Sequence, residues 1–348
     1  MRLLETLGID LPIVQAPMAG VSSPAMAAAV ANAGALGSIG VGATNADGAR
    51  RMIAAVRERS SRSLNVNVFC HEQPRTDAAL EAAWLDHLRP TFERFNAQPP
   101  ASLKPSYGTF IDDDAMLAAL LTDRPRVVSF HFGLPGADRI RALRDAGIVL
   151  LASTTSVAEA RIAARAGVHA VVAQGYEAGG HRGVFDPDAH DDRLGTIALT
   201  RLLVRELDVP VIAAGGIMDG AGIAAVLRLG AAAAQLGTAF IACAESDADA
   251  GYRAALASDA AHHTVMTRAI SGRPARCLRN EFTALSAGVP PQQIPVYPIT
   301  YDAGKALNAA AKAAGEAGFG AQWAGQGAPL TRSMPAAKLI AALVSEMH

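Results

Sequence analysis

Residues 156–174, SVAEARIAARAGVHAVVAQ, carry the pattern that decides the fold. Thr155 precedes a segment with helical spacing at 156–166, and the pair Ala166-Gly167 ends it. Hydroxyl side chains are preferred at helix N-termini, and glycine is preferred just beyond helix C-termini. The run AVVAQ that follows is apolar on both faces, which is typical of a parallel strand covered on both sides. The stretch therefore predicts one helix–strand unit of an α/β protein.

The same unit recurs along the first two thirds of the chain. Apolar runs predict strands at 12–16, 36–40, 64–69, 127–132, 148–152, 170–174, 211–215 and 234–238. Helical patterns lie between them at 24–33, 46–58, 112–122, 137–146, 156–166, 196–207 and 219–229. Strands and helices that alternate in this number and over this length predict a (β/α)8 TIM barrel.

Two regions interrupt the alternation. Residues 70–106 follow the third strand and contain a polar helical pattern and the proline-rich run NAQPPASLKP, so we interpret them as a lid-like insertion. Beyond the eighth strand, residues 245–285 are predicted to be helical, and a helix at 335–347 ends the chain. We therefore expect a barrel over 1–245 and a mainly helical appendage over 246–348, whose last helix packs on the barrel.

The composition excludes several classes of protein. The chain has 348 residues, is 51% hydrophobic and 18% charged, and carries a net charge of −1 without blocks of like charge. We therefore expect no nucleic acid and no membrane as partner. The apolar runs are too short for a membrane span, and the N-terminus does not read as a signal peptide. The cysteines (Cys70, Cys243 and Cys277) lack CxxC spacing, so we expect a cytoplasmic protein without disulfides or a metal site.

Glycines follow the last two predicted barrel strands. In this fold active residues lie at the carboxyl ends of the strands, and a phosphate commonly binds after strands seven and eight. Gly215 and Gly216 allow the backbone to approach an anion closely, while Gly237 and Thr238 supply an N–H group and a hydroxyl. A tight turn would explain either pair alone, but both pairs on adjacent strands predict a phosphate site.

Four amide side chains also lie at predicted strand ends: Gln15, Asn67, Gln174 and Gln235. An amide both donates and accepts hydrogen bonds, so it can bind the edge of a heteroaromatic ring. The alternative is that these amides satisfy backbone groups at the strand ends. A phosphate site combined with ring-binding amides indicates a nucleotide-like cofactor. Because the chain has no GxGxxG in a Rossmann context, flavin mononucleotide (FMN) fits better than a dinucleotide.

Two histidines follow strand ends on the predicted active rim. A neutral imidazole is a natural general base near pH 7. Gly179 and Gly180 precede His181 and allow its ring to be aimed inward, and Glu177 or Arg182 could tune it. His131 lies between two phenylalanines, so a packed histidine is an equally good interpretation. His181 is therefore the predicted base.

A cluster of tyrosines and one lysine lies outside the barrel pattern. Tyr297, Tyr301 and Lys305 are spaced by four residues, which places them on one face if the segment is helical. Tyr107 precedes the fourth strand. The alternative for all of them is an exposed edge of the appendage.

Together these motifs resemble the nitronate monooxygenase family, formerly called 2-nitropropane dioxygenases. The matching stretches are QAPMAG at 15–20, NVNVF at 65–69, SFHFG at 129–133, ASTTS at 152–156, AQGYEAGGHRG at 173–183, AAGGI at 213–217 and QLGTAF at 235–240. The tail that contains Tyr297, Tyr301 and Lys305 is similar to that of the class I bacterial members. The resemblance covers nearly the whole chain.

The resemblance implies FMN as cofactor, His181 as base, and Tyr107, His131, Tyr297, Tyr301 and Lys305 on the substrate side. The residues implied to hold FMN are Pro17, Met18, Asn67, Gln174, Gly179, Gly180, Gly216, Gln235, Gly237 and Thr238. The implied reaction is oxidation of a small nitronate such as propionate 3-nitronate by O2, through a flavin semiquinone, to a carbonyl compound and nitrite. We expect a monomer or a homodimer.

Two other functions remain open from the sequence. FMN-dependent enoyl-acyl-carrier-protein reductases and some NADH:quinone reductases share the barrel and several of these motifs, so an NAD(P)H-dependent flavin reductase is the first alternative. A non-catalytic flavin- or phosphate-binding module is the second, but it leaves the histidines and tyrosines without a role.

Overall fold

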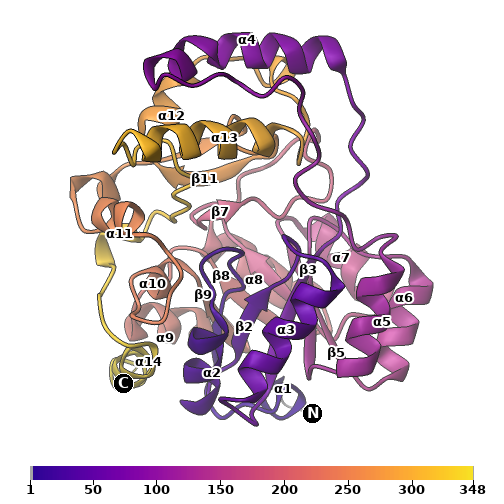
Figure 1. Cartoon of the computed structure of the whole chain (residues 1–348). Helices are drawn as coiled ribbons and strands as arrows, with labels where there is room; N and C mark the ends of the chain where they lie inside the picture. The colour runs from indigo at the N-terminus through magenta and orange to yellow at the C-terminus, as the bar shows by residue number, and fades with distance from the viewer. Residues whose placement is uncertain (1–2, 348) are drawn as a thin grey trace.

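The computed structural model describes residues 3–347 and contains the predicted barrel (Figure 1). Eight parallel strands form one sheet in the order β1-β9-β8-β6-β5-β4-β3-β2. Their bounds are Ile13–Gln15 (β1), Gly37–Gly40 (β2), Leu64–Phe69 (β3), Val127–His131 (β4), Val149–Thr154 (β5), Ala170–Gln174 (β6), Val211–Ala214 (β8) and Ala233–Leu236 (β9). The two edges of the sheet meet where Gln15 N donates to Leu36 O at 2.9 Å and Leu36 N donates to Ile13 O at 3.0 Å. The TIM-barrel prediction is confirmed.

Helices lie between successive strands, as the caps in the sequence predict. They are α2 (Pro24–Asn32), α3 (Ala46–Arg57), α5 (Asp114–Asp123), α6 (Ala137–Asp145), α7 (Val157–Ala166), α8 (Thr196–Glu206) and α9 (Gly220–Arg228). In α7 the Ser156 side chain accepts the N–H of Glu159, which satisfies one of the unpaired donors of the first turn. Gly167 follows that helix with a φ of +94°, a left-handed conformation that glycine adopts without steric cost.

The amino-terminal end of the barrel is closed by apolar side chains. Helix α1 (Leu3–Leu7) places Leu3 and Leu7 in one cluster with Val14, Leu36 and other strand residues that point into the barrel. Because this end is filled, space for a ligand remains only at the carboxyl ends of the strands, where TIM-barrel active sites lie.

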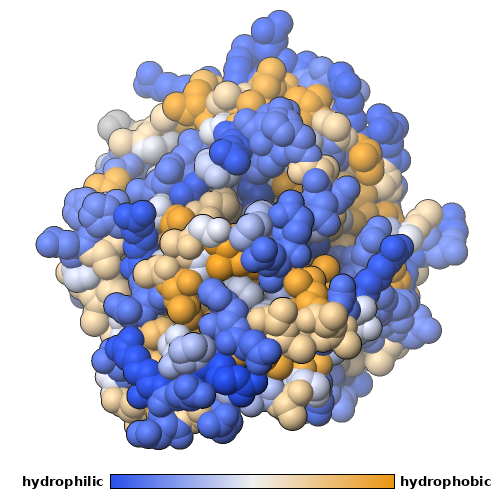
Figure 2. Space-filling model, turned by 90° about the horizontal axis from the view of Figure 1, so that it is seen from above, coloured by the Kyte–Doolittle hydropathy of each residue, from blue (hydrophilic) through white to orange (hydrophobic). Residues whose placement is uncertain are grey.

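A cap covers the carboxyl ends of the strands. It combines α4 (Ala78–Arg94) from the predicted insertion with α12 (Glu281–Leu285) and α13 (Thr300–Ala313) from the appendage (Figure 1). Trp84 and Leu88 of α4 belong to one buried cluster with Ile299 and Leu307. Seen from above, the outer surface is mostly hydrophilic with scattered apolar patches (Figure 2). The segment predicted to be lid-like is therefore packed on the appendage by a shared core.

The prediction of helix over 245–285 is wrong in part. This region contains α11 (Ala250–Leu256) and the 3-10 turn Asp259–His262, but then the antiparallel strands β10 (Thr264–Thr267) and β11 (Ala275–Leu278). Strand β11 also pairs with β7 (Gly180–His181), which completes a three-stranded sheet above the barrel. The local pattern gave no signal for this sheet because its central strand pairs with residues far away in the sequence.

The remaining elements lie after β9, and one of them, the turn Pro291–Gln293, lies between α12 and α13 of the cap. They are α10 (Thr238–Ile241), the 3-10 turns Pro291–Gln293 and Ala328–Leu330, and the last helix α14 (Ala336–Ser345). Leu339 and Leu343 of α14 pack with Met26 of α2 and Ile223 of α9 in one apolar cluster. The last helix therefore packs on the barrel.

Candidate active site

One cavity lies between the carboxyl ends of the strands and the cap. It encloses about 1250 Å3 of empty space, including solvent at its mouth. Every predicted site residue except Gln15 and Lys305 lines it: Pro17, Met18, Asn67, Tyr107, His131, Gln174, Gly179, Gly180, His181, Gly215, Gly216, Gln235, Gly237, Thr238, Tyr297 and Tyr301. The structure thus brings together residues that are spread over nearly 290 positions of the chain.

The glycine-rich side of this cavity is suited to an anion. Gly215 and Gly216 adopt φ angles of +119° and +70°, so the turn after β8 depends on glycine. The N–H groups of Gly216 and Gly237 find no backbone acceptor within residues 3–347. Unpaired N–H groups on bare glycines are the usual donors to a phosphate, so these residues fit the phosphate of FMN.

The cap also contacts the glycine-rich side of the cavity, at Gly179. A Cβ on Gly179 would lie 2.4 Å from Gly325 N and 2.5 Å from Ala324 C, which is too close for any side chain. Gly325 N donates to Thr238 Oγ1 at 3.0 Å, so the loop after β6, the start of α10 and the cap meet there. Gly179 is therefore required for close backbone approach, whereas Gly180 is favoured by its φ of +73°.

The four amides divide into two kinds. Gln15 donates to Ser22 Oγ at 2.8 Å and accepts from Ser38 N at 2.9 Å, and it does not line the cavity. Gln174 donates to His181 O at 3.0 Å and accepts from Gly183 N at 2.7 Å. Both satisfy backbone or neighbouring groups, as the alternative expects, but Gln174 also lines the cavity, so its predicted contact with the cofactor stays a prediction.

Asn67 and Gln235 keep polar atoms for a ligand. Asn67 donates to Ser129 O and Oγ at 3.1 and 3.0 Å, while its Oδ1 has no donor within the described chain. No hydrogen bond of the Gln235 side chain is found within residues 3–347, and Gln235 lines the cavity. These two amides can bind a ring edge.

His181 points into the cavity from β7. Its Nε2 lies 2.9 Å from Ser271 Oγ. Its ring centroid lies 5.5 Å from those of Phe132 and Tyr297 and 5.1 Å from that of Trp323. Burial, with smaller contributions from His131 and Arg273, lowers the pKa of His181 to about 3. The ring is therefore neutral at pH 7 and holds a free lone pair.

His131 is both packed and part of the cavity. Its ring lies 4.5 Å from that of Phe132 and 6.4 Å from that of Phe69. Its Nε2 lies 3.3 Å from the carbonyl oxygen of His181, which can only accept, so Nε2 carries the hydrogen. Burial lowers the pKa of His131 to about 4, so this ring is neutral as well.

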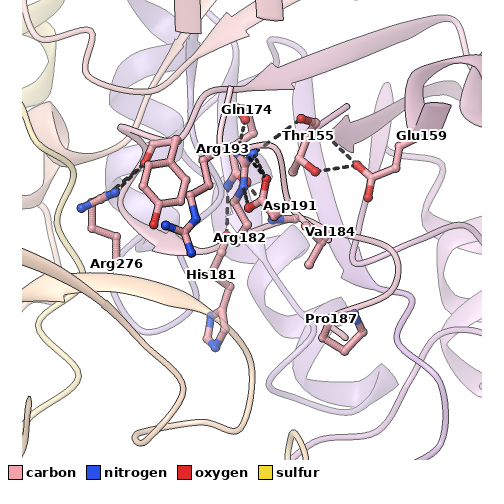
Figure 3. A network of polar contacts seen from close by, with 12 residues as sticks. Thr155, Glu159, Gln174, His181, Arg182, Val184, Pro187, Asp191, Arg193 and Arg276 are labelled. Atoms are coloured by element: carbon pink, nitrogen blue, oxygen red, sulfur yellow. Dashed lines mark hydrogen bonds and ion pairs between the residues drawn. The ribbon is translucent and has the colours of Figure 1, made fainter. Parts of the chain in front are cut away.

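The loop that carries His181 is fixed by a buried arginine (Figure 3). Arg182 is 2% exposed, forms an ion pair with Asp191 at 2.8 Å and donates to the carbonyl oxygens of Gln174 and Thr155. Glu177 accepts hydrogen bonds from Thr196 instead. Neither residue has a hydrogen bond to the His181 ring, and the charges that lower its pKa are those of His131, Arg273 and His71; Arg182 and Glu177 hold the loop.

The three predicted tyrosines form one aromatic wall. The ring of Tyr107 lies 6.3 Å from that of Tyr297 and 5.4 Å from that of Tyr301. Burial raises the pKa of each phenol, so all three remain protonated donors. The Tyr297 hydroxyl is buried without a partner within residues 3–347, which leaves it available to a substrate.

Lys305 is placed differently from the prediction. It lies one turn after Tyr301 on α13, and its Nζ is 4.3 Å from the ring centroid of Tyr107 and 5.2 Å from that of Tyr301. It does not line the cavity. Lys305 therefore contacts the rings of Tyr107 and Tyr301 and does not reach the cavity itself.

Sequence reasoning missed three cap residues near the site: Trp323, Ser271 and Arg273. Trp323 lines the cavity from a glycine-rich segment, a composition that could have indicated a ligand loop. Arg273 is 4% exposed, lies 4.4 Å above the Phe132 ring, and its Nε has no partner within the described residues. Burial lowers the pKa of Arg273 to about 10, so it stays charged at pH 7. Nothing in the local sequence distinguishes Ser271 or Arg273.

Comparison with known proteins decides the family. A family model described as nitronate monooxygenase matches residues 1–346. The chain belongs to the nitronate monooxygenase family. It is 63% identical over 345 residues to a nitronate monooxygenase of Paraburkholderia phytofirmans, covering 99% of this chain and 94% of the relative. It is 53% identical over 349 residues to one of Pseudomonas aeruginosa, covering 100% of this chain and 99% of the relative.

A solved structure agrees with the sequence comparison. Nitroalkane oxidase from Streptomyces ansochromogenes aligns with a TM-score of 0.90 and 41% identity, and the alignment covers 99% of this chain and 97% of that one. This nitronate monooxygenase family member is therefore an oxidoreductase, and the family resemblance predicted from its motifs is confirmed.

Residues 3–347 contain no metal-binding group, no membrane-spanning helix and no paired cysteines. Within residues 3–347 no group of His, Cys, Asp and Glu side chains could hold a metal ion. In the same residues no helix is long and apolar enough to span a membrane. Each of the three cysteines is buried and unpaired.

Arg273 gives the first prediction for this enzyme. Its charge lowers the pKa of both cavity histidines, so the variant Arg273→Met should raise these pKa values. The acidic limb of the pH profile of kcat/KM should shift to higher pH. The affinity for an anionic nitronate should fall by about tenfold, because one nearby positive charge is lost.

Arg268→Met is the matched control for this experiment. Arg268 holds the same segment through Asp188 and Pro187, but it is paired with a carboxylate. An unchanged pH profile in Arg273→Met, or an equal shift in both variants, would contradict the electrostatic role of Arg273.

Proposed function

We propose that the enzyme binds FMN and uses O2 to oxidise small alkyl nitronates, such as propionate 3-nitronate, to a carbonyl compound and nitrite. The observation that carries this proposal is a neutral histidine, His181, in one cavity with a glycine cradle and a wall of phenol donors. Membership of the family supports oxidation of nitronates.

The glycine side of the cavity would hold the FMN phosphate. The N–H groups of Gly216 and Gly237 would donate to it, and Gly179 with Gly180 would lie against it. Asn67 and Gln235 would bind polar atoms at the ring edge, while Pro17 and Met18 line the same cavity. When bound, FMN supplies the redox chemistry, and the protein supplies position and electrostatics.

His181 would act when the substrate is a neutral nitroalkane. The α C–H bond breaks, the proton moves to a ring nitrogen of His181, and the electron pair delocalises into the nitro group, which gives the nitronate. The Tyr297 hydroxyl and the charge of Arg273 would stabilise the negative charge on the nitro oxygens. A preformed nitronate does not need this proton transfer.

The test uses the purified protein as isolated. A flavin spectrum, with FMN released on denaturation, and nitrite formation from propionate 3-nitronate in air would support the proposal. A colourless protein that cannot be loaded with FMN would overturn it. Rapid anaerobic bleaching by NADH or NADPH, with an inert nitronate, would assign the chain to the flavin reductases instead.

A further inference from the structure

Ser271 lies directly behind the ring of His181. It is fully buried in the connection between β10 and β11. Its Oγ lies 2.9 Å from His181 Nε2 and 3.3 Å from the carbonyl oxygen of Arg273. The hydroxyl therefore stands between a ring nitrogen that can donate or accept and a carbonyl that can only accept.

The hydroxyl has one hydrogen, which can go to only one of these partners. If it goes to His181 Nε2, the Arg273 carbonyl has no donor within residues 3–347. If it goes to that carbonyl, His181 donates its Nε2–H to Ser271 Oγ, and all three groups are satisfied. A buried acceptor without a donor is unfavourable, so the second arrangement is the more stable one.

We propose that Ser271 is a positioning residue that holds His181 in the tautomer with hydrogen on Nε2, so that Nδ1 accepts the substrate proton. The proposal rests on the proposed function for its catalytic meaning. In the step itself the α C–H bond breaks, its proton binds Nδ1, and the electron pair remains on the substrate as the nitronate. Ser271 neither gains nor loses a proton, because the Nε2–H···Oγ–H···O chain to Arg273 is kept throughout.

A purely structural role for Ser271 would predict different results. Arg273 N also lies 3.4 Å from Ser271 Oγ, so the serine could simply stabilise this turn. In that case its loss would lower the stability of the protein without changing the His181 tautomer or the ratio of activities on two substrates.

The first experiment reads the tautomer directly. Holoenzyme labelled with 15N-histidine is studied by long-range 1H–15N correlation NMR, and the His181→Asn variant identifies the signal of His181. Wild type should show a protonated Nε2 and an unprotonated Nδ1. The opposite tautomer in wild type would overturn the proposal, whether or not the enzyme oxidises nitronates. In Ser271→Ala the single tautomer should be lost.

The second experiment compares a neutral nitroalkane with its preformed nitronate. Loss of one orienting hydrogen bond in Ser271→Ala should lower kcat/KM for nitroethane by about tenfold, with a much smaller change for ethyl nitronate. Ser271→Thr keeps the hydroxyl and should restore both the tautomer and the ratio. Equal loss on both substrates would refute the positioning role.

Ser286→Ala is the matched control. Ser286 is a buried serine whose hydroxyl also donates to a carbonyl, that of Phe282 at 2.9 Å, but it does not line the cavity. The Ser286→Ala variant should leave the His181 tautomer unchanged. It should also leave unchanged the ratio of kcat/KM for nitroethane to that for ethyl nitronate. If wild type acts on neither substrate, the proposed function fails, and the NMR result still decides the tautomer. If Ser271→Ala does not fold, wild type and Ser271→Thr remain decisive.

Discussion

Replacement of His181 by asparagine should lower kcat/KM for a neutral nitroalkane by at least about 100-fold, the usual contribution of a general base. The reason is that His181 has a neutral ring in the cavity, with its Nε2 2.9 Å from Ser271 Oγ. A preformed nitronate has already lost the α-proton, so its oxidation should change far less. Steady-state nitrite formation with nitroethane and ethyl nitronate measures both values.

His131→Asn is the comparison for this prediction. His131 lines the same cavity, but its Nε2–H is used by the carbonyl of His181. We expect this variant to affect both substrates to a similar degree, because the hydrogen bond from His131 to the His181 carbonyl is lost with either substrate. Equal losses on both substrates in His181→Asn would show that His181 is not the base.

The barrel could be predicted because its signals are local. Most barrel helices begin at a capping side chain, as α7 does at Ser156, and each strand is a short apolar run that parallel sheets require. The N–H groups of the glycine turns after β8 and β9 could be predicted as well, since the fold itself specifies which strand ends bind phosphate. These features depend on a few consecutive residues and on a general rule.

The parts that could not be predicted depend on contacts between distant segments. His181 was identified, but the strand that holds it, β7, exists only because β11 pairs with it. Ser271 and Arg273 reach the cavity from that same connection, and no local pattern marks them. The helical spacing of Tyr301 and Lys305 was correct, yet Lys305 packs on the Tyr107 ring and does not line the cavity.

The amides show how one pattern can have two meanings. Gln174 ends β6 and Asn67 lies two residues before the end of β3, and the sequence predicts both as amides at the carboxyl ends of barrel strands. In the structure Gln174 donates to His181 O and accepts from Gly183 N, so both polar ends of its amide are paired within the 181–183 loop. Asn67 donates to Ser129 O, and its Oδ1 remains available to a ligand in the cavity. Whether such an amide is paired depends on whether the loop that follows the strand folds back over it. The residues of the strand itself do not determine the path of that loop.

Replacement of Gly179 by alanine should remove most of the bound flavin. The added Cβ would meet backbone atoms of Gly325 and Ala324 at 2.4 and 2.5 Å, and backbone cannot swing aside as a flexible side chain can. The loop after β6 must therefore move away from the cap, which displaces Gly180 and His181 together. We expect at least about tenfold weaker FMN binding and a loss of about 1–3 kcal/mol in unfolding free energy, as for other overpacked sites. Flavin absorbance per protein and urea unfolding measure the two effects.

Gly136→Ala separates this effect from a general intolerance of glycine substitution. A Cβ on Gly136 would meet nothing within 4 Å, and its φ of −58° suits any residue. This variant should keep its flavin and lose at most the roughly 1 kcal/mol expected for alanine at the N-cap of α6. Full flavin content in Gly179→Ala would mean that the loop can yield without moving the cradle, and the glycine pair would then not be needed for cofactor binding. Loss of flavin in Gly179→Ala but not in Gly136→Ala would show that flavin binding depends on the close contact between Gly179 and the cap. The same contact holds the loop that carries His181.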